Sequence, residues 1–330
     1  MNTHPRHDPR RVLHDRELLL LLEEHGSLSR SHAAALSSMS ESTLRRVSNE
    51  LLQAGLLSLR YGAETPDQGK TDLLCFSRFG VLTLLEITPT RLHFRMEDTR
   101  GECLHAQSRL RNPFLPTEED IRLLQGKLSP LMKAPWGASD LPILPPVLLL
   151  SPDADQELVK TAVARVFPPT AVLTTEQASA IALTNHPFPR DRRDLLLLHD
   201  GEEPYATLLY RQPHDPPLSP SPYTPCLTEK LRQCIAKAPP GTSARAEGLA
   251  AFLQGLCDYI SPSCVVLEGE LVSPLQGTLQ SSVEKALPRQ TPLLSLTYSR
   301  SHPSLAHRGA LLHARRILWS RRLEELKPRS

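Results

Sequence analysis

The stretch that decides the fold is LSRSHAAALSSMSESTLRRVSNELLQAGLLS, from Leu28 to Ser58. It predicts a short helix over Ser29–Leu36, a tight turn, and a second helix from Ser40 to about Gln53. Serine is favoured at helix N-caps, and a serine stands at the start of each helix. Gly55 is placed to end the second helix, because glycine readily adopts the left-handed conformation found there. Two such helices joined by a turn are typical of a helix-turn-helix, whose usual partner is double-stranded DNA.

The flanking residues extend this motif. A leucine-rich helix is predicted before it, over Asp15–Glu24, and two short strands after it, at Leu56–Arg60 and Asp72–Ser77. A helix-turn-helix followed by a hairpin is a winged helix. We therefore expect a winged helix-turn-helix domain over residues 13–77, preceded by a flexible tail, residues 1–12.

The polar face of the second helix carries the candidate DNA contacts. Arginine can donate two hydrogen bonds to guanine, and asparagine pairs in the same way with adenine. Basic side chains in the following hairpin are candidate phosphate contacts. An ordinary solvated helix face has a similar composition, so the assignment depends on the preceding turn and the following strands. The candidates are Ser42, Thr43, Arg45, Arg46 and Asn49 on the helix, and Arg60 and Lys70 in the hairpin.

Composition sets wider limits. The 330 residues carry a formal net charge of +2, and the first 62 hold eight arginines against seven carboxylates, so the DNA prediction rests on pattern rather than bulk charge. The six cysteines form no Cys-x-x-Cys pair, and the N-terminus MNTHPRHDPRR is polar. Both features indicate reduced thiols in a cytoplasmic protein. The apolar runs are too short to span a membrane.

Beyond residue 78 the pattern changes to strands that alternate with helices, which indicates an α/β domain of two lobes. Hairpins are expected at Gly80–Ile87 with Arg91–Asp98 and at Asp194–His199 with Tyr205–Arg211. Residues 212–225, QPHDPPLSPSPYTP, contain six prolines and predict an extended loop. Helices are expected at Thr117–Met132, Gln156–Val166, Glu176–Leu183, Leu227–Ala236, Ala246–Ile260, Leu275–Ala286 and from His307 to about Leu326, with further strands at Glu102–Ser108, Val147–Ser151, Ala171–Leu173, Cys264–Leu267 and Leu293–Leu296.

Three segments resemble the ROK family (repressors, open reading frames, sugar kinases), in its transcriptional-regulator branch. SRSHAAALSSMSESTLRRVSNELLQAGLL (29–57) is similar to the family's helix-turn-helix. ISPSCVVLEGELVSP (260–274) resembles the segment where a helix ends and an apolar strand begins, and GALLHARRILW (309–319) resembles the closing helix. The resemblance implies a two-lobed actin-like, sugar-kinase-like (ribonuclease-H-like) domain. Its lobes would cover residues 78–184 and 185–306, and a C-terminal helix, 307–330, would return to the first lobe.

The same resemblance implies that the kinase motifs are lost. The family's first phosphate turn needs glycine, because the backbone approaches the phosphate closely there. Here that turn is Leu85–Pro89, which contains no glycine. The catalytic Asn-Asp pair falls on Glu176–Gln177, and Gln177 cannot deprotonate a sugar; Glu176 could do so in a register shifted by one residue. The second phosphate loop is the acidic His199–Glu203, and the adenosine-side loop keeps Gly269. Only Cys226 stands for the family's zinc cysteines, and one cysteine does not make a zinc site.

These features predict a DNA-binding transcriptional regulator whose ROK-like domain is a ligand sensor or dimerisation domain, with no catalytic residue, cofactor or metal. The expected partners are double-stranded DNA, a sugar or sugar phosphate effector, and a second copy in a homodimer. Two alternatives stay open: an active sugar kinase with an N-terminal DNA-binding domain, and a structural scaffold that binds no ligand.

Overall fold

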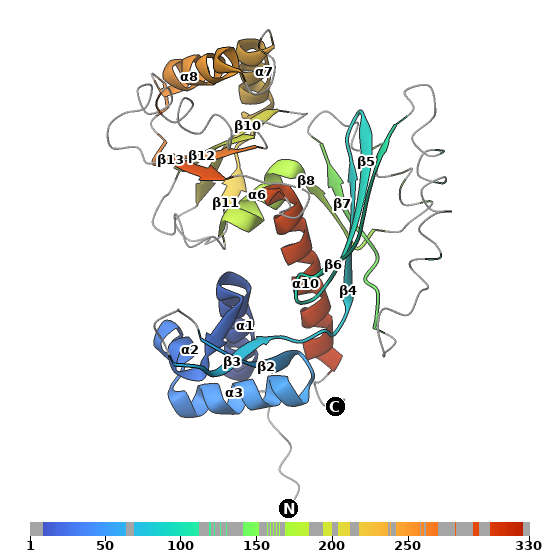
Figure 1. The fold of residues 1–330 in the computed structure, drawn as a ribbon, viewed down its shortest axis with the longest axis vertical. Helices are drawn as coiled ribbons and strands as arrows, with labels where there is room; N and C mark the ends of the chain where they lie inside the picture. The colour runs from blue at the N-terminus through green and yellow to red at the C-terminus, as the bar shows by residue number, and fades with distance from the viewer. Residues whose placement is uncertain are drawn as a thin grey trace, which may run out of the picture. The chain divides into compact units, whose positions relative to one another are not determined.

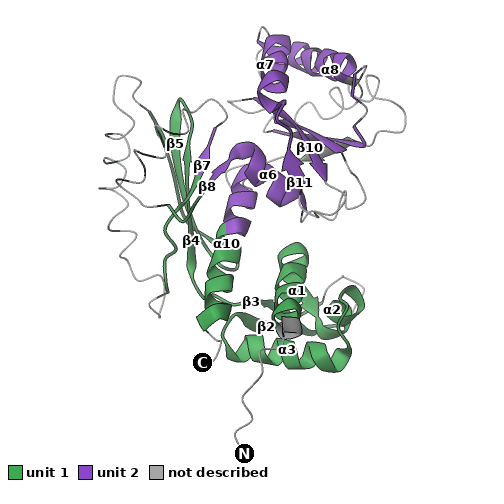
Figure 2. Cartoon of the chain, turned by 180° about the vertical axis from the view of Figure 1, so that it is seen from behind, with its two compact units in different colours: residues 1–148, 155–171, 314–330 green, residues 149–154, 172–313 purple. Residues whose placement is uncertain are grey.

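The structure is a computed structural model. It describes residues 9–63, 69–111, 141–151, 169–184, 194–199, 204–211, 218–236, 242–257, 259–260, 262–269, 293–296 and 304–325, with single positions between these ranges (Figure 1). The chain divides into two compact units (Figure 2). Unit 1 comprises residues 1–148, 155–171 and 314–330, and unit 2 comprises residues 149–154 and 172–313. Within the described ranges, no helix has the length and apolarity needed to cross a membrane.

Unit 1 begins with three helices and a small antiparallel sheet of order β1-β3-β2. The elements are α1 (Pro9–His25), β1 (Ser27–Ser29), α2 (Arg30–Leu36), α3 (Glu41–Gln53), β2 (Leu57–Gly62) and β3 (Thr71–Phe76). The predicted helix α1 was too short, because it begins at Pro9 rather than Asp15. Proline is well suited to the first turn of a helix, where its missing N–H has no partner to lose. Part of the expected flexible tail is therefore helical.

Local signals set the ends of α2 and α3 as the sequence predicted. The Ser29 and Ser40 side chains accept hydrogen bonds from the N–H groups of His32 and Thr43, so both serines are N-caps. Gly55 follows the C-cap residue of α3 and adopts a φ of 72°, in the left-handed region, so the helix does not continue past it.

The core of this N-terminal part draws on both ends of the chain. Apolar side chains of α1, α2, α3 and the small sheet pack around Leu18, Leu19 and Leu22, which are fully buried. Trp319 of the C-terminal helix α10 (Leu305–Glu325) joins the same core. The leucine run of α1 is apolar on several faces because it packs against both the small helices and α10.

The second sheet has the order β6-β5-β4-β7-β8. Its strands are β4 (Val81–Ile87), β5 (Arg91–Asp98), β6 (Cys103–Leu110), β7 (Val147–Leu150) and β8 (Ala171–Thr174). The pairing of β4 with β5 is antiparallel, as the sequence predicted. Helices expected at 117–132, 156–166 and 275–286 lie essentially outside the described residues.

Unit 2 contains a mixed sheet of order β11-β10-β9-β12-β13. Its elements are α6 (Thr175–Thr184), β9 (Asp194–His199), β10 (Tyr205–Arg211), β11 (Leu218–Pro220), α7 (Thr224–Ile235), α8 (Ser243–Cys257), β12 (Cys264–Glu268) and β13 (Leu293–Leu296). Leu196 and Leu198 of β9 pack with α7 and α8, whereas Leu195 and Leu197 pack with α6. The leucine run of β9 therefore reflects a strand that is buried on both faces.

The proline-rich segment differs from its prediction as an extended loop. Leu218–Pro220 form β11, which pairs with β10, and Thr224 and Pro225 already belong to α7. An edge strand accommodates Pro220 because one side of such a strand needs no ladder hydrogen bond. Pro225 fits the first turn of α7 for the same reason that Pro9 fits α1.

Candidate functional site

Helix α3 presents most of the predicted DNA contacts and is held firmly against the rest of the N-terminal part. Its buried side chains, Leu44, Val47, Ser48 and Leu51, lie on one face. The opposite face exposes Ser42, Arg45, Arg46 and Asn49, and Thr43 is half-buried. The five residues that the sequence placed on one helix therefore do lie on α3, and all of them except the half-buried Thr43 are exposed.

The turn between α2 and α3 is fixed by a carboxylate of α1. Glu17 Oε1 accepts a hydrogen bond from the Ser38 backbone N–H at 2.7 Å, and Glu17 Oε2 accepts one from the Ser38 hydroxyl at 3.0 Å. Two charge-assisted bonds to one residue define the geometry of the turn. The sequence prediction missed Glu17, because nothing local relates a residue of α1 to a turn 21 residues later.

Arg30, the first residue of α2, reaches across to α3. Its Nε donates to Ser48 Oγ at 3.1 Å, and its Nη2 donates to Asn49 Oδ1 at 3.2 Å. Because Arg30 engages the carbonyl oxygen of the Asn49 amide, it sets the orientation of that amide. The sequence prediction included Asn49 but not Arg30.

The two neighbouring arginines of α3 differ in their surroundings. Arg46 forms an ion pair with Glu50 one turn later, at 3.1 Å. Arg45 is exposed, and its side chain makes no hydrogen bond or ion pair with another residue of the described part of the chain. An unpaired guanidinium on an exposed helix face is available to an external acceptor, such as a base edge or a phosphate.

Arg60 and Lys70 lie on the hairpin formed by β2 and β3. Arg60 is exposed on β2, and Lys70 is exposed directly before β3 begins at Thr71. Tyr61, beside Arg60, is 70% exposed and adds an aromatic ring to this surface. Two cations and an aromatic side chain can contact a phosphate backbone.

The positions expected to carry kinase chemistry have structural partners. Gln177 Oε1 accepts a hydrogen bond from the Thr174 N–H at 3.0 Å, and the Gln177 N–H donates to Thr174 Oγ1 at 3.2 Å. This reciprocal pair is a capping box at the start of α6. Glu176, its neighbour, is 5% exposed.

A second group of such residues lies at the ends of β9 and β12 in unit 2. His199 Nδ1 lies 3.1 Å from Glu268 Oε2, and the His199 ring stacks on Tyr205 with 4.8 Å between ring centroids. Glu268 is buried, and its other oxygen accepts a hydrogen bond from the Leu305 N–H at the start of α10. A helix N-terminus attracts anions, and here the protein's own carboxylate occupies it.

The turn that the resemblance relates to the first phosphate loop is held by hydrogen bonds among nearby residues. The Thr88 N–H donates to the Arg91 carbonyl and the Arg91 N–H donates to Thr88 Oγ1, both at 2.9 Å. Arg111 donates to the Thr88 carbonyl at 3.0 Å. Cys226 is exposed on α7, and among the described residues no group of three or more His, Cys, Asp or Glu could hold a metal.

Comparison with known proteins identifies the fold. No protein-family model matches the chain, and no curated protein matches it in sequence. A crystal structure of a ROK family transcriptional regulator, a homologue of the E. coli MLC protein, aligns over 96% of this chain and 99% of its own, with a TM-score of 0.58 and 12% identity. This confirms, for the fold, the resemblance to ROK proteins that the sequence indicated.

ROK kinases also appear among the similar structures. An inorganic polyphosphate/ATP-glucomannokinase from Arthrobacter sp. strain KM covers 71% of this chain and 98% of its own, with 12% identity and a TM-score of 0.48. A ROK hexokinase from Thermus thermophilus covers 73% and 99%, with 10% identity and a TM-score of 0.46.

Proposed function

We propose that the chain is a sequence-specific, DNA-binding transcriptional regulator of the ROK type, acting in the cytoplasm. Residues 13–77 would form a winged helix-turn-helix, with α3 as the recognition helix and β2–β3 as the wing. The observation that carries the proposal is the exposed polar face of α3, where the Arg45 guanidinium has no described partner while Glu17 and Arg30 hold the helix in place. The fold it shares with a ROK transcriptional regulator supports the same reading.

The test is DNA binding by the Arg45→Ala/Arg46→Ala double variant. DNA bound to the wild-type chain is first selected from a random duplex library, and its affinity for the variant is then measured by fluorescence anisotropy. We expect a loss of at least about thirtyfold in affinity, because two base-reading pairs at about 1–3 kcal/mol each contribute about 2–6 kcal/mol together. The control is Arg308→Ala/Arg321→Ala, which removes two exposed arginines of α10 and the same total charge. Equal affinity of the two double variants would contradict the recognition-helix assignment.

We further propose that the rest of the chain is a ROK-like domain without kinase activity. Three observations support this. Gln177 serves a capping box, the carboxylate of Glu268 occupies the N-terminus of α10, and the turn at Thr88 is held by hydrogen bonds among nearby residues. A coupled assay with ATP and common hexoses or N-acetylated amino sugars should give no phosphorylation. ATP-dependent turnover would favour the alternative of an active sugar kinase.

The ROK-like domain would sense a sugar or sugar phosphate and support a homodimer. A lone winged helix contacts little DNA, so two copies commonly bind a pseudo-palindromic site. Light scattering should give about twice the monomer mass of 36.7 kDa. Thermal-shift screening with sugars and sugar phosphates separates a sensor from a scaffold that binds no ligand.

A further inference from the structure

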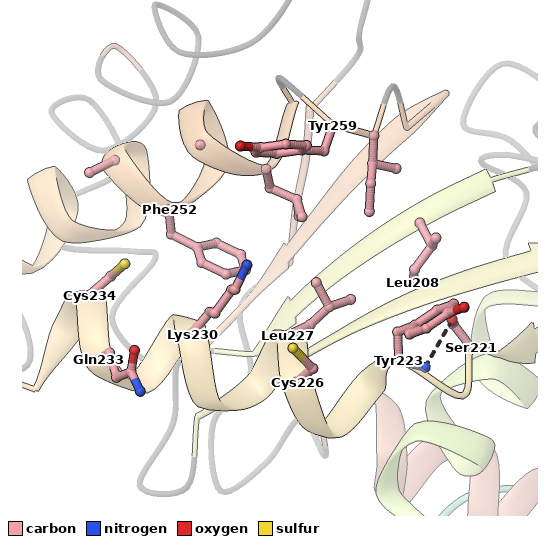
Figure 3. A pocket seen from close by; sticks show the side chains of 14 residues that line it. Leu208, Ser221, Tyr223, Cys226, Leu227, Lys230, Gln233, Cys234, Phe252 and Tyr259 are labelled. Atoms are coloured by element: carbon pink, nitrogen blue, oxygen red, sulfur yellow. Dashed lines mark hydrogen bonds between the residues drawn. The ribbon is translucent and has the colours of Figure 1, made fainter.

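A pocket of about 410 Å³ lies in unit 2 between α7 and α8, above β10 (Figure 3). Its volume is within the range of small-molecule sites, roughly 300–1,000 Å³. The α7 side is contributed by residues spaced three or four apart, so it is one face of that helix. This pocket plays no part in the DNA-binding proposal. Of the positions that the resemblance relates to kinase motifs, its described lining includes Cys226 alone.

The floor of the pocket is the open edge of a hydrophobic core. Leu227, Phe252 and Leu256 line it, and all three are buried members of the cluster that packs α7 and α8 onto the sheet. Tyr223 and Tyr259, at 72% and 89% exposure, also line it. Apolar surface that opens to solvent between aromatic rings suits a ligand with an apolar body.

Two glycines of α8 show that the two helices are close at one end of the pocket and apart at the other. A Cβ on Gly248 would lie 2.6 Å from the Cys234 carbonyl oxygen of α7, so the helices need glycine where they cross. A Cβ on Gly255, two turns later and in the lining, would meet nothing within 4 Å. Glycine in a helix costs about 1 kcal/mol relative to alanine, and packing within the chain does not explain Gly255.

The charge of the lining selects the class of ligand. Among the described lining residues, Lys230 is the one cation and none is acidic. Figure 3 shows Lys230 reaching from α7 toward Phe252. The Lys230 side chain makes no hydrogen bond or ion pair with another described residue. An ammonium beside apolar side chains favours a ligand in which an anion is attached to an apolar group. The aliphatic stem of the lysine can pack against the apolar group while its ammonium pairs with the anion.

We propose that this pocket binds a small amphiphilic carboxylate, whose apolar body fills the space beside Gly255 and whose carboxylate pairs with Lys230. A free sugar fits the site poorly, since its hydroxyls need several polar partners and the floor offers leucine and phenylalanine. The ligand class therefore differs from the sugar effector suggested for the ROK-like domain.

Calorimetry with decanoate and 1-decanol tests the proposal on the full chain. A Cβ at Gly255 meets nothing within 4 Å, so Gly255→Leu adds a side chain at the lining, and we expect at least a tenfold loss of decanoate affinity. Gln254→Leu is the matched control, because it places the same side chain at the adjacent exposed position outside the lining, and it should bind as the wild type does. Lys230→Met keeps the apolar stem, and it should weaken decanoate roughly three- to tenfold while leaving decanol unchanged.

Absence of saturable decanoate binding, or equal binding by Gly255→Leu and Gln254→Leu, would overturn the proposal that this pocket is the ligand site. Equal effects of Lys230→Met on decanoate and decanol would overturn the assignment of an anionic ligand. If Gly255→Leu instead halves the mass measured by light scattering and no ligand binds, a second copy covers the pocket and the proposal is wrong.

Discussion

Arg316 Nε donates a hydrogen bond to Glu23 Oε2 at 2.8 Å, joining two residues that are 293 positions apart in the chain. Trp319 Nε1 donates to the other oxygen of the same carboxylate at 3.2 Å. Both partners lie on α10, and Glu23 lies on α1. The carboxylate is fully buried, so it fixes the C-terminal helix to the first helix of the N-terminal part.

Replacing Glu23 with alanine should destabilise unit 1 by about 2–3 kcal/mol, because it removes the acceptor of the Arg316 guanidinium and of the Trp319 indole N–H. Burial lowers the pKa of Arg315, and the charge of Glu23 is the largest influence that opposes this shift. The same variant therefore also weakens the compensation of Arg315, whose guanidinium lies over the Phe76 ring. The free energy of unfolding in urea measures the effect.

The control for this prediction is Glu325→Ala. Glu325 pairs with Arg322 of α10 at the same 2.8 Å, but its side chain is 63% exposed. Exposed ion pairs contribute about 0–1 kcal/mol to the free energy of unfolding, so Glu325→Ala should cost no more than that. Equal losses in the two variants would show that burial of Glu23 does not determine its contribution.

Glycine positions in helices give a second prediction. A Cβ on Gly309 of α10 would collide with the backbone carbonyl of Ala178 in α6, so Gly309→Ala forces two helices apart. We expect a loss of about 2 kcal/mol or more in the stability of unit 2. Gly255→Ala, also in a helix but facing open space, should be neutral or stabilising by up to about 1 kcal/mol. Thermal unfolding followed by circular dichroism compares the two, and a stable Gly309→Ala variant would contradict the close approach.

Features that depend on neighbouring residues could be predicted from the sequence. Ser29 and Ser40 were placed as N-caps, and Gly55 as the helix stop, because capping is decided within a few residues. The three-residue strand β1 was missed, since its only support is the pairing of residues such as Leu28 with Leu74 far along the chain. Its length gives no periodic pattern to detect.

The candidate site shows the same division. The polar face of α3 follows from helical periodicity, but the contact of Arg30 with Asn49 depends on how two helices cross. Gln177 was interpreted only as a lost catalytic residue. Its structural role could have been found, because Thr174-x-x-Gln177 has the spacing of a capping box at a helix start.

Arg30 gives a third prediction, which rests on the proposed DNA binding. Its Nη2 engages Asn49 Oδ1, so the Asn49 amide presents its N–H donors outward. Donors suit guanine N7 and O6 or thymine O4, whereas pairing with adenine also needs the amide oxygen. Arg30→Met should free that oxygen and change base preference at one position of the selected site, as measured by repeating the selection. Asn49→Ala should abolish the preference at that position, and an Arg30→Met profile identical to the wild type would refute the orienting role.

Lys70 gives a fourth prediction, which rests on the proposed contact between DNA and the hairpin of β2 and β3. As a phosphate contact it should supply one released counterion, so Lys70→Met should reduce the slope of log affinity against log salt concentration by about one, with little change in base preference. Arg45→Met should instead weaken binding mainly to the selected sequence, because a base contact carries the sequence information. Anisotropy titrations from 50 to 300 mM salt, with selected and scrambled duplexes, separate the two. If Lys70→Met leaves the salt slope unchanged on both duplexes, the hairpin of β2 and β3 does not contact the backbone at Lys70, and α3 would have to bind DNA without that part of the wing.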